Sequence, residues 1–144
     1  MKVRIKRLDA TLPLPTYATA GSVGFDFLAR EEVRIASKSV ALIPGNVVVE
    51  TPPGHMLLVS LRSSAPRKKG LLKPHGIGVI DQDYCGPNDE VMIQVYNFTD
   101  EEVIVERGER VAQGIFVPVS TVEWDEVSEM DGASRGGFGS TGTH

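Results

Sequence analysis

Short apolar runs rich in β-branched residues recur along this chain, and turn-forming residues separate them. The runs cover residues 47–49, 57–61, 91–96, 103–105 and 111–119. Short strands at this spacing, with proline, glycine, asparagine and aspartate between them, predict an all-β sandwich or barrel. The Pro52-Pro53-Gly54 stretch predicts a tight link between two antiparallel strands.

Residues 60–72 are the only stretch with room for a helix, and Pro66 confines a short helix to either side of it. The sequence shows no repeat and no interdomain linker, so its 144 residues predict one main domain. We place that domain at residues 1–131 and treat residues 132–144 as a separate arm.

The bulk properties limit the compartment and the partners. Cys85 is the single cysteine, so no disulfide can form within the chain, and a reducing compartment is expected. The net charge of -4 argues against a broad nucleic-acid-binding surface. The first residues lack the apolar core of a signal peptide, and no run approaches the roughly 20 apolar residues of a membrane span. We therefore expect a cytoplasmic protein with no nucleic-acid or membrane partner.

The segment after the second apolar run contains groups suited to binding an anion. It reads LRSSAPRKKG and includes Arg62, Ser63 and Ser64. Arginine offers a planar fork to phosphate oxygens, and hydroxyl groups complete such a cradle. A solvated basic loop is the plainer interpretation, and Arg67 to Lys69 fit it better than Arg62 does.

Residues 76–86 read GIGVIDQDYCG and place two acids after an apolar strand. A carboxylate such as Asp81 or Asp83 can orient or deprotonate a water molecule. The ring of Tyr84 can pack against a sugar. A plain hairpin explains the two acids almost as well.

Two further segments have ordinary structural interpretations when taken alone. In AGSVGFDF, Asp26 lies between two phenylalanines and can simply face solvent from a strand. In ERGERVAQGIF, Gln113 lies where a turn enters a buried strand. The chain shows no metal-ligand spacing of histidine and cysteine, no Gly-x-Ser-x-Gly elbow and no Walker-type phosphate loop.

The last residues, 132–144, read GASRGGFGSTGTH. So glycine-rich a segment buries too little apolar surface to order itself, and a disordered terminus is the plainer interpretation. An arm that closes over a ligand would look the same, because glycine lets backbone N–H groups approach phosphates.

Taken together, AGSVGFDF, RSSA, GVIDQDYCG, ERGERVAQGIF and GGFGSTG resemble, in this order, the five motifs of the trimeric dUTPase family. The resemblance spans residues 20–142 and implies a distorted jelly-roll fold, a homotrimer with shared active sites and the hydrolysis of dUTP to dUMP and diphosphate. It also implies that Mg²⁺ is held by the triphosphate and by water, without a direct protein ligand.

The resemblance assigns roles to individual residues. Asp81 matches the acid that activates the attacking water, and Tyr84 matches the ring that packs under deoxyribose. Backbone groups near Gly76 match those that bind uracil, whereas Asp26 and Asp83 match supporting acids. Phosphate or base contacts fall on Arg62, Ser63, Ser64, Gln113, Arg135, Phe138, Gly139, Ser140 and Thr141.

Three positions depart from the family pattern. The arginine that precedes the glycines of the last motif is replaced by Ala133, and the nearest arginine is Arg135. The segment 86–90 looks longer than the usual link to the next strand. His75 occupies a position where some relatives have asparagine.

Two other functions compete with dUTP hydrolysis. dCTP deaminases and bifunctional deaminase/dUTPases share the fold, but they carry a catalytic glutamate where this chain has Gln94. An amide cannot shuttle a proton as a carboxylate does. A structural or regulatory jelly-roll protein is the non-enzymatic alternative, and the joint presence of Arg62, Asp81, Tyr84 and Phe138 argues against it.

Overall fold

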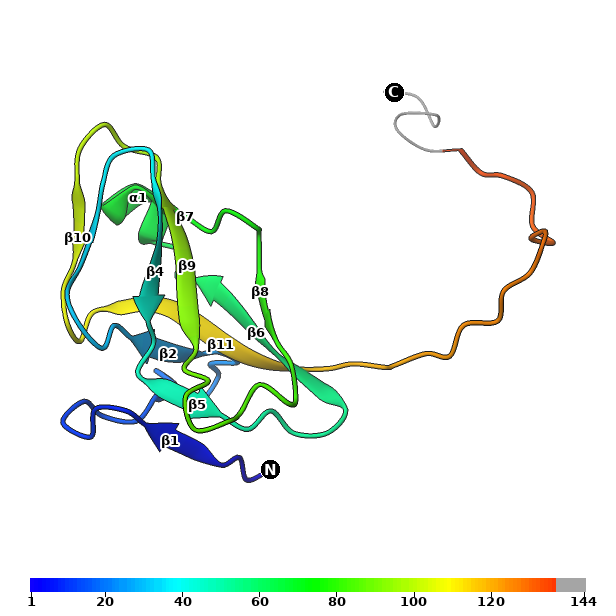
Figure 1. Cartoon of the computed structure of the whole chain (residues 1–144), viewed down its shortest axis with the longest axis horizontal. Coiled ribbons are helices and arrows are strands. Elements are labelled where there is room, and N and C mark those ends of the chain that lie inside the picture. The colour runs from blue at the N-terminus through cyan, green and yellow to red at the C-terminus, as the bar shows by residue number, and fades with distance from the viewer. Residues whose placement is uncertain (137–144) are drawn as a thin grey trace.

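The regular secondary structure is β-strand apart from one short helix in the computed structural model, which describes residues 1–136. This confirms the all-β class expected from the short apolar runs. The elements are β1 (Ile5–Arg7), β2 (Phe25–Leu28), β3 (Val33–Ile35), β4 (Val40–Pro44), β5 (Val47–Val49), β6 (His55–Leu61), α1 (Ala65–Lys69), β7 (Leu71–Leu72), β8 (Gly78–Ile80), β9 (Met92–Asn97), β10 (Val103–Val105) and β11 (Arg110–Pro118) (Figure 1).

Two larger sheets and two strand pairs, all antiparallel, build the body of the molecule. One sheet has the order β2-β11-β6-β8, and the other has the order β4-β9-β7. β1 pairs with β5, and β10 pairs with β3. β11 lies between β2 and β6, so the last strand of the chain joins segments from its first half (Figure 1).

One hydrophobic core holds the sheets together. Phe27, Ile43, Leu57, Ile93 and Val95 are fully buried. On β9 the buried side chains of Ile93 and Val95 alternate with more exposed ones, as expected for a strand with one face on the core. Burial of such side chains stabilises a fold by about 1.5–3 kcal/mol each.

Gly114 lets β11 cross directly above the aromatic part of this core. A Cβ atom at this position would lie 2.6 Å from the ring of Phe25 and 2.8 Å from that of Phe27. A larger residue would therefore push β11 away from β2. The close approach sets the spacing between β11 and the aromatic rings, and with it the position of the preceding residue, Gln113.

The predicted strands match β5, β6, β9, β10 and β11 closely, and the short helix α1 lies within residues 60–72 as predicted. The expectation that Pro66 confines the helix to either side is wrong, because Pro66 lies in the first turn of α1, where proline is tolerated. Gly70 ends α1 with a left-handed φ of 65°, and its N–H donates to the carbonyl of Pro66 at 3.1 Å. The interpretation of Pro52-Pro53-Gly54 is wrong. β5 pairs with β1 and β6 pairs with β11 and β8, so this link joins two sheets and not two paired strands.

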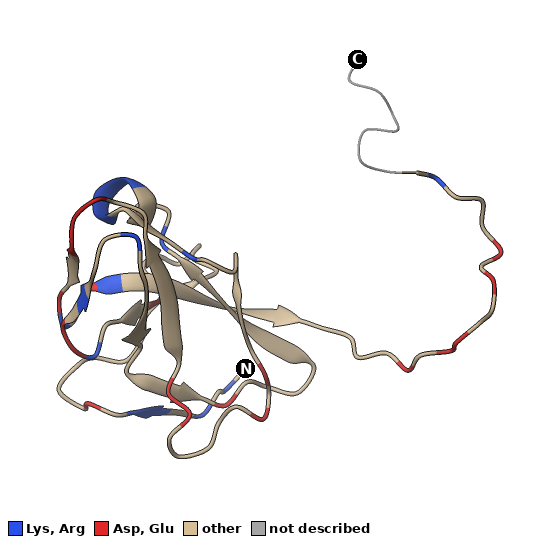
Figure 2. Ribbon diagram, turned by 45° about the horizontal axis from the view of Figure 1, so that its top comes forward, with Lys and Arg blue, Asp and Glu red and all other residues tan. Residues whose placement is uncertain are grey.

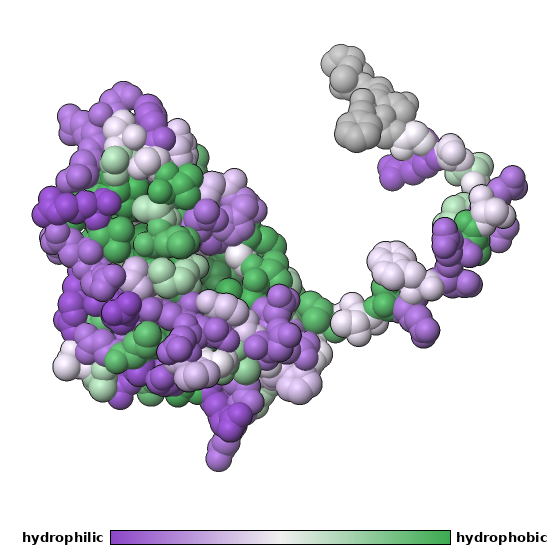
Figure 3. All heavy atoms as spheres, viewed as in Figure 1, coloured by the Kyte–Doolittle hydropathy of each residue, from purple (hydrophilic) through white to green (hydrophobic). Residues whose placement is uncertain are grey.

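The outer face of the β4-β9-β7 sheet is unusually apolar for an exposed surface. Val40 and Leu42 are 51% and 53% exposed, and Leu72 and Met92 are also exposed. Apolar residues gather over β4 and β9 in Figure 3. Large exposed apolar patches commonly mark contact surfaces between proteins.

The chain leaves the body after β11. Residues 119–136 contain no helix or strand, are exposed along their length and extend away from the sheets (Figure 1). Five acids lie on this C-terminal segment, as Figure 2 shows: Glu123, Asp125, Glu126, Glu129 and Asp131. The domain boundary proposed at residue 131 stays a prediction.

Candidate active site

Asp26 lies at the centre of a charged cluster on the β2-β11-β6 part of the sheet. Its Oδ1 accepts a hydrogen bond from Gln113 Nε2 at 3.2 Å and lies 3.4 Å from Arg62 Nε. Its Oδ2 accepts a hydrogen bond from Arg110 Nη1 at 3.4 Å. The sheet register places Gln113 opposite Asp26 on β2 and opposite Ser60 on β6. We call these four side chains, Asp26, Arg62, Arg110 and Gln113, the Asp26 cluster.

The burial of Asp26 overturns the simplest interpretation of the sequence around it. The residue is 6% exposed, so it does not face open solvent between the two phenylalanines. A buried carboxylate needs charged or hydrogen-bonding partners, because its removal from water is costly. Arg62, Arg110 and Gln113 supply them, and the acid in turn fixes where their donor groups lie.

Arg110 was not predicted as a site residue. Strict alternation along β11 would direct residues 110 and 113 to opposite faces of the sheet. The register against β2 shifts between Arg110 and Ala112, however, and such a bulge redirects side chains. The bulge brings the Arg110 side chain to the same face of the sheet as Asp26. No pattern in the sequence predicts this bulge.

A groove of about 480 Å³ adjoins the Asp26 cluster, between α1 and the start of β11. Arg62, Ser64, Lys68 and Arg110 contribute to its lining. Ser64 precedes α1 without a side-chain hydrogen bond to the helix, and Ser63 beside it is exposed. Arginine, lysine and free hydroxyl groups around one groove are suited to phosphate oxygens.

Asp81 and Asp83 lie on the exposed loop that follows β8, which we call the Asp81 loop (residues 81–84). Within residues 1–136, neither carboxylate has a hydrogen-bond or ion-pair partner. Tyr84 is held more firmly, since its N–H donates to the carbonyl of Asp81 at 3.4 Å and its hydroxyl donates to the carbonyl of Glu90 at 3.1 Å. The residue is 38% exposed.

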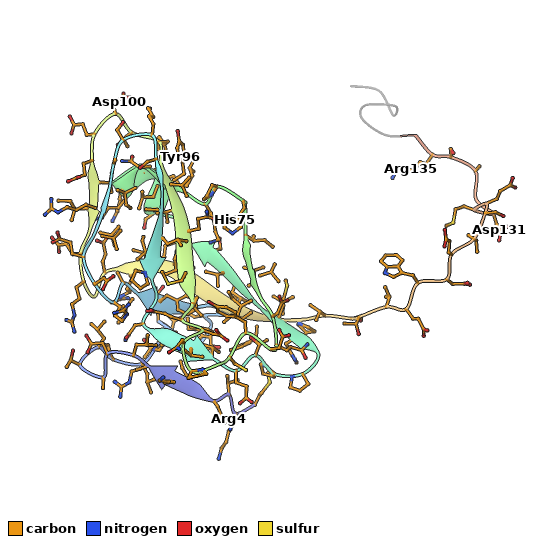
Figure 4. All side chains as sticks on the ribbon, viewed as in Figure 1. Arg4, His75, Tyr96, Asp100, Asp131 and Arg135 are labelled. Carbon is orange, nitrogen blue, oxygen red and sulfur yellow. The ribbon has the colours of Figure 1, made fainter. Side chains whose placement is uncertain are left out.

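Gly76 lies in the turn of residues 73–77, which joins β7 to β8. Its φ of 78° is left-handed, and nothing lies within 4 Å of a Cβ built on it. Its N–H donates to the carbonyl of Lys73 at 3.2 Å. His75 beside it is exposed, at the end of the turn seen in Figure 4. Burial lowers the pKa of the Lys73 ammonium, which packs near Gly78.

The two groups of predicted site residues do not meet within one chain. Ile80 pairs with Leu57 near the start of β6, whereas Arg62 follows the end of that strand. The Asp81 loop and the Asp26 cluster are thus separated by roughly 17 Å of strand, at about 3.3 Å per residue. No single side chain spans this distance.

Arg135 lies far along the C-terminal segment and away from both groups (Figure 4). The other residues predicted on the arm, Phe138, Gly139, Ser140 and Thr141, lie outside the described residues. Gln94 is half-buried on β9, where it pairs with Leu42 of β4.

Within residues 1–136, no three histidine, cysteine, aspartate or glutamate side chains gather as a metal site would require. The described part of the chain also has no helix long and apolar enough to cross a membrane.

Comparison with known proteins gives a consistent result. The family model named dUTPase matches residues 10–142. The deoxyuridine 5'-triphosphate nucleotidohydrolase of Lactococcus lactis is 42% identical, and the match covers 99% of each chain. The crystal structure of the Streptococcus mutans dUTPase has a TM-score of 0.76 at 35% identity, over 83% of this chain and 98% of that one.

A third relative is the dUTPase of Staphylococcus bacteriophage 80alpha, solved with dUPNHPP. It has a TM-score of 0.86 at 26% identity, and the match covers 98% of each chain. The resemblance inferred from the five motifs is therefore confirmed, and the chain belongs to the dUTPase family.

Proposed function

We propose that the chain hydrolyses dUTP to dUMP and diphosphate, and that water attacks the α-phosphate. The observation that carries this proposal is the dUTPase family match across residues 10–142. A solved relative with a dUTP analogue bound supports the same substrate. This reaction limits the uracil that enters DNA and supplies dUMP for the synthesis of dTMP.

Asp81 is the proposed general base. Its carboxylate is exposed and has no partner within residues 1–136, so it is free to accept a proton from water. A positioned carboxylate of this kind contributes about 10²–10⁴ to the rate. Asp83, two residues further on, is assigned a supporting role.

The Asp26 cluster and the adjoining groove are the proposed triphosphate site. Charge on the phosphate oxygens grows as the leaving diphosphate departs, and fixed donors stabilise it. Arg62, Gln113 and the hydroxyl groups of Ser63 and Ser64 are the donors, whereas Asp26 orients two of them through hydrogen-bond and charge contacts. Asp26 is thus a positioning residue.

The base and sugar belong to the other side of the site. Backbone groups near Gly76 are proposed to bind uracil, and Tyr84 packs under deoxyribose and leaves no room for a 2′-hydroxyl. From the arm, we propose that Phe138 stacks on uracil and that Arg135, Gly139, Ser140 and Thr141 approach the phosphates.

The separation of roughly 17 Å between the two groups supports a site shared between copies of the chain. We propose a homotrimer, in which the Asp81 loop of one copy faces the Asp26 cluster of the next. The apolar outer face of β4-β9-β7 offers surface for such contacts. The assembled mass would be about three times 15.6 kDa.

The donor set fits Mg²⁺ that arrives with the substrate. Mg²⁺ prefers oxygen ligands and keeps several waters, and it usually takes few protein ligands besides substrate phosphates. The Asp26 carboxylate is already engaged by two arginines and Gln113, and the groove beside it is basic. When bound, the ion neutralises triphosphate charge, held by phosphate oxygens and water.

The single cysteine, Cys85, supports a reducing compartment, and we propose the cytoplasm. A diphosphate-release assay with dUTP, dCTP and UTP tests the activity itself. We expect turnover of dUTP and far slower turnover of UTP. Release of ammonia from dCTP would instead favour the deaminase, which the amide at Gln94 argues against.

A further inference from the structure

The segment 86–90 forms a closed turn between the Asp81 loop and β9. Asp89 accepts a hydrogen bond from the Gly86 N–H on its Oδ2 at 2.7 Å, and its own N–H donates to the carbonyl of Gly86 at 3.2 Å. Lys6 Nζ on β1 donates to the carbonyl of Pro87 at 2.8 Å. The segment 86–90, which looked longer than the usual link, is therefore an ordered turn with its own hydrogen bonds.

Glu90 anchors the end of this turn inside the protein. Glu90 is 7% exposed, and its carboxylate accepts hydrogen bonds from Arg30 Nε at 2.9 Å and Arg30 Nη2 at 3.1 Å. Oε1 also accepts the backbone N–H of Asn46 at 2.8 Å. The ion pair raises the pKa of the Arg30 guanidinium. A bidentate pair with a third donor is rigid and specific in geometry.

Asn46 extends the anchor further into the body. It is 1% exposed with a left-handed φ of 68°, and its side chain exchanges hydrogen bonds with the backbone of Asp9 at 2.8 and 3.1 Å. The backbone of Glu90 cannot move without breaking several of these bonds. Its carbonyl, the acceptor of the Tyr84 hydroxyl, is therefore a fixed point.

We infer that Glu90 is a positioning residue that holds the Tyr84 ring against the sugar and so enforces selection of deoxyribose over ribose. The inference rests on the proposed function. A 2′-hydroxyl adds one oxygen atom, so a ring that could retreat by about an ångström would admit it. The hydroxyl of Tyr84 ties the ring to the Glu90 carbonyl, and Arg30 and Asn46 hold Glu90 in place.

Two variants test this tether. Tyr84→Phe keeps the ring and removes only the hydroxyl, whereas Glu90→Gln keeps the size of the side chain and leaves one of the Arg30 and Asn46 donors without a good acceptor. We expect each to lower the ratio of kcat/KM for dUTP to that for UTP by about fivefold or more, the scale of one lost hydrogen bond. Because both act on one tether, the double variant should show little further loss.

Glu31→Gln is the matched control, since Glu31 also pairs with Arg30, at 3.4 Å, but is exposed. It should leave the ratio unchanged. A purely structural role would lower the efficiency for both substrates together. An unchanged ratio in Tyr84→Phe, or fully multiplicative losses in the double variant, would overturn the inference. If Glu90→Gln does not fold, the dUTP-to-UTP ratio of Tyr84→Phe alone tests the inference. Turnover of dUTP by the unmodified chain tests the proposed activity separately.

Discussion

The Asp26 cluster and the Asp81 loop belong to one proposed site but differ in what holds them. The cluster lies on β2, on β11 and just after the end of β6, and its acid is buried and bound by three partners. The carboxylate of Asp81 lies exposed on a loop without a partner in the described chain. The proposed phosphate-binding groups are thus fixed within each copy, whereas the proposed general base has no partner among the described residues of its own copy.

Replacement of Asp81 should separate the two halves most sharply. Asp81→Asn should reduce kcat by about 10²–10⁴ with little change in KM, because an amide cannot accept the proton of the attacking water. The melting temperature should not change, since the side chain is exposed. Asp83→Asn, which changes an equally exposed acid, should lose far less. Near-normal turnover of Asp81→Asn would show that Asp81 is not the general base.

Mixing two inactive chains tests whether the halves come from different copies. Chains with Asp81→Asn and chains with Arg62→Ala should each be inactive, but mixed in equal amounts they should recover about a quarter of normal activity in randomly assembled trimers. Activity should be measured after the chains are unfolded and refolded together. If no activity returns although mixed oligomers form, each copy builds its own site.

The arm is the third proposed contributor, and its loss should matter less than that of Asp81. Base–aromatic stacking is worth roughly 1–3 kcal/mol, so Phe138→Ala should lower kcat/KM about tenfold. Deletion of residues 132–144 should cost more than this. Arg135→Ala should approach the deletion if Arg135 takes the place of the arginine missing at Ala133. An unchanged kcat/KM after the deletion would exclude the arm from the site.

Replacement of Asp26 should affect stability as well as binding, in contrast to Asp81. Asp26→Asn leaves two guanidinium groups without their carboxylate, and we expect a loss of about 1–3 kcal/mol in the free energy of unfolding. KM for dUTP should rise several-fold as Arg62 and Gln113 lose their orientation. Chemical denaturation and steady-state kinetics measure both. A variant with unchanged stability and normal KM would show that Asp26 neither stabilises the fold nor positions Arg62 and Gln113.

Lys73 offers the smallest and most selective test, on the turn beside the Asp81 loop. Its folded pKa lies below the usual 10.5 because burial disfavours the charged form. The unfolded chain therefore binds more protons in the range just below 10.5, and stability should rise as the pH increases through it. Lys73→Met should melt higher than the parent at pH 7, and the difference should shrink towards pH 10. A constant difference would contradict this.

The sequence predicted the strands formed by uninterrupted apolar, mostly β-branched runs, and it missed strands that only tertiary contacts define. β6, β9 and β11 follow their β-branched runs, whereas β1 contains two basic residues and β7 has only two residues, so neither shows an apolar β-branched run. The ordered motifs predicted Arg62, Asp81 and Gln113 as site residues. Asp26 was assigned only a supporting role, since alternation says which face a side chain takes and not what covers that face.

The contacts of Arg110 and Glu90 could not be predicted from the sequence. Arg110 reaches Asp26 only because of a bulge, whose position depends on the register between β11 and β2. Glu90 and Arg30 are sixty residues apart in the chain and meet inside the body. Neither a local pattern nor a propensity encodes such a pair.

The charge of the Asp26 cluster bears on how the site releases its product. Two guanidinium groups and one carboxylate leave a single positive charge. A second positive charge here would attract the triphosphate substrate and the diphosphate product alike, and affinity shared by both slows release without speeding the chemical step. We expect Asp26 to keep the grip on phosphate weak enough for diphosphate to leave, so that the same buried acid serves both order and turnover.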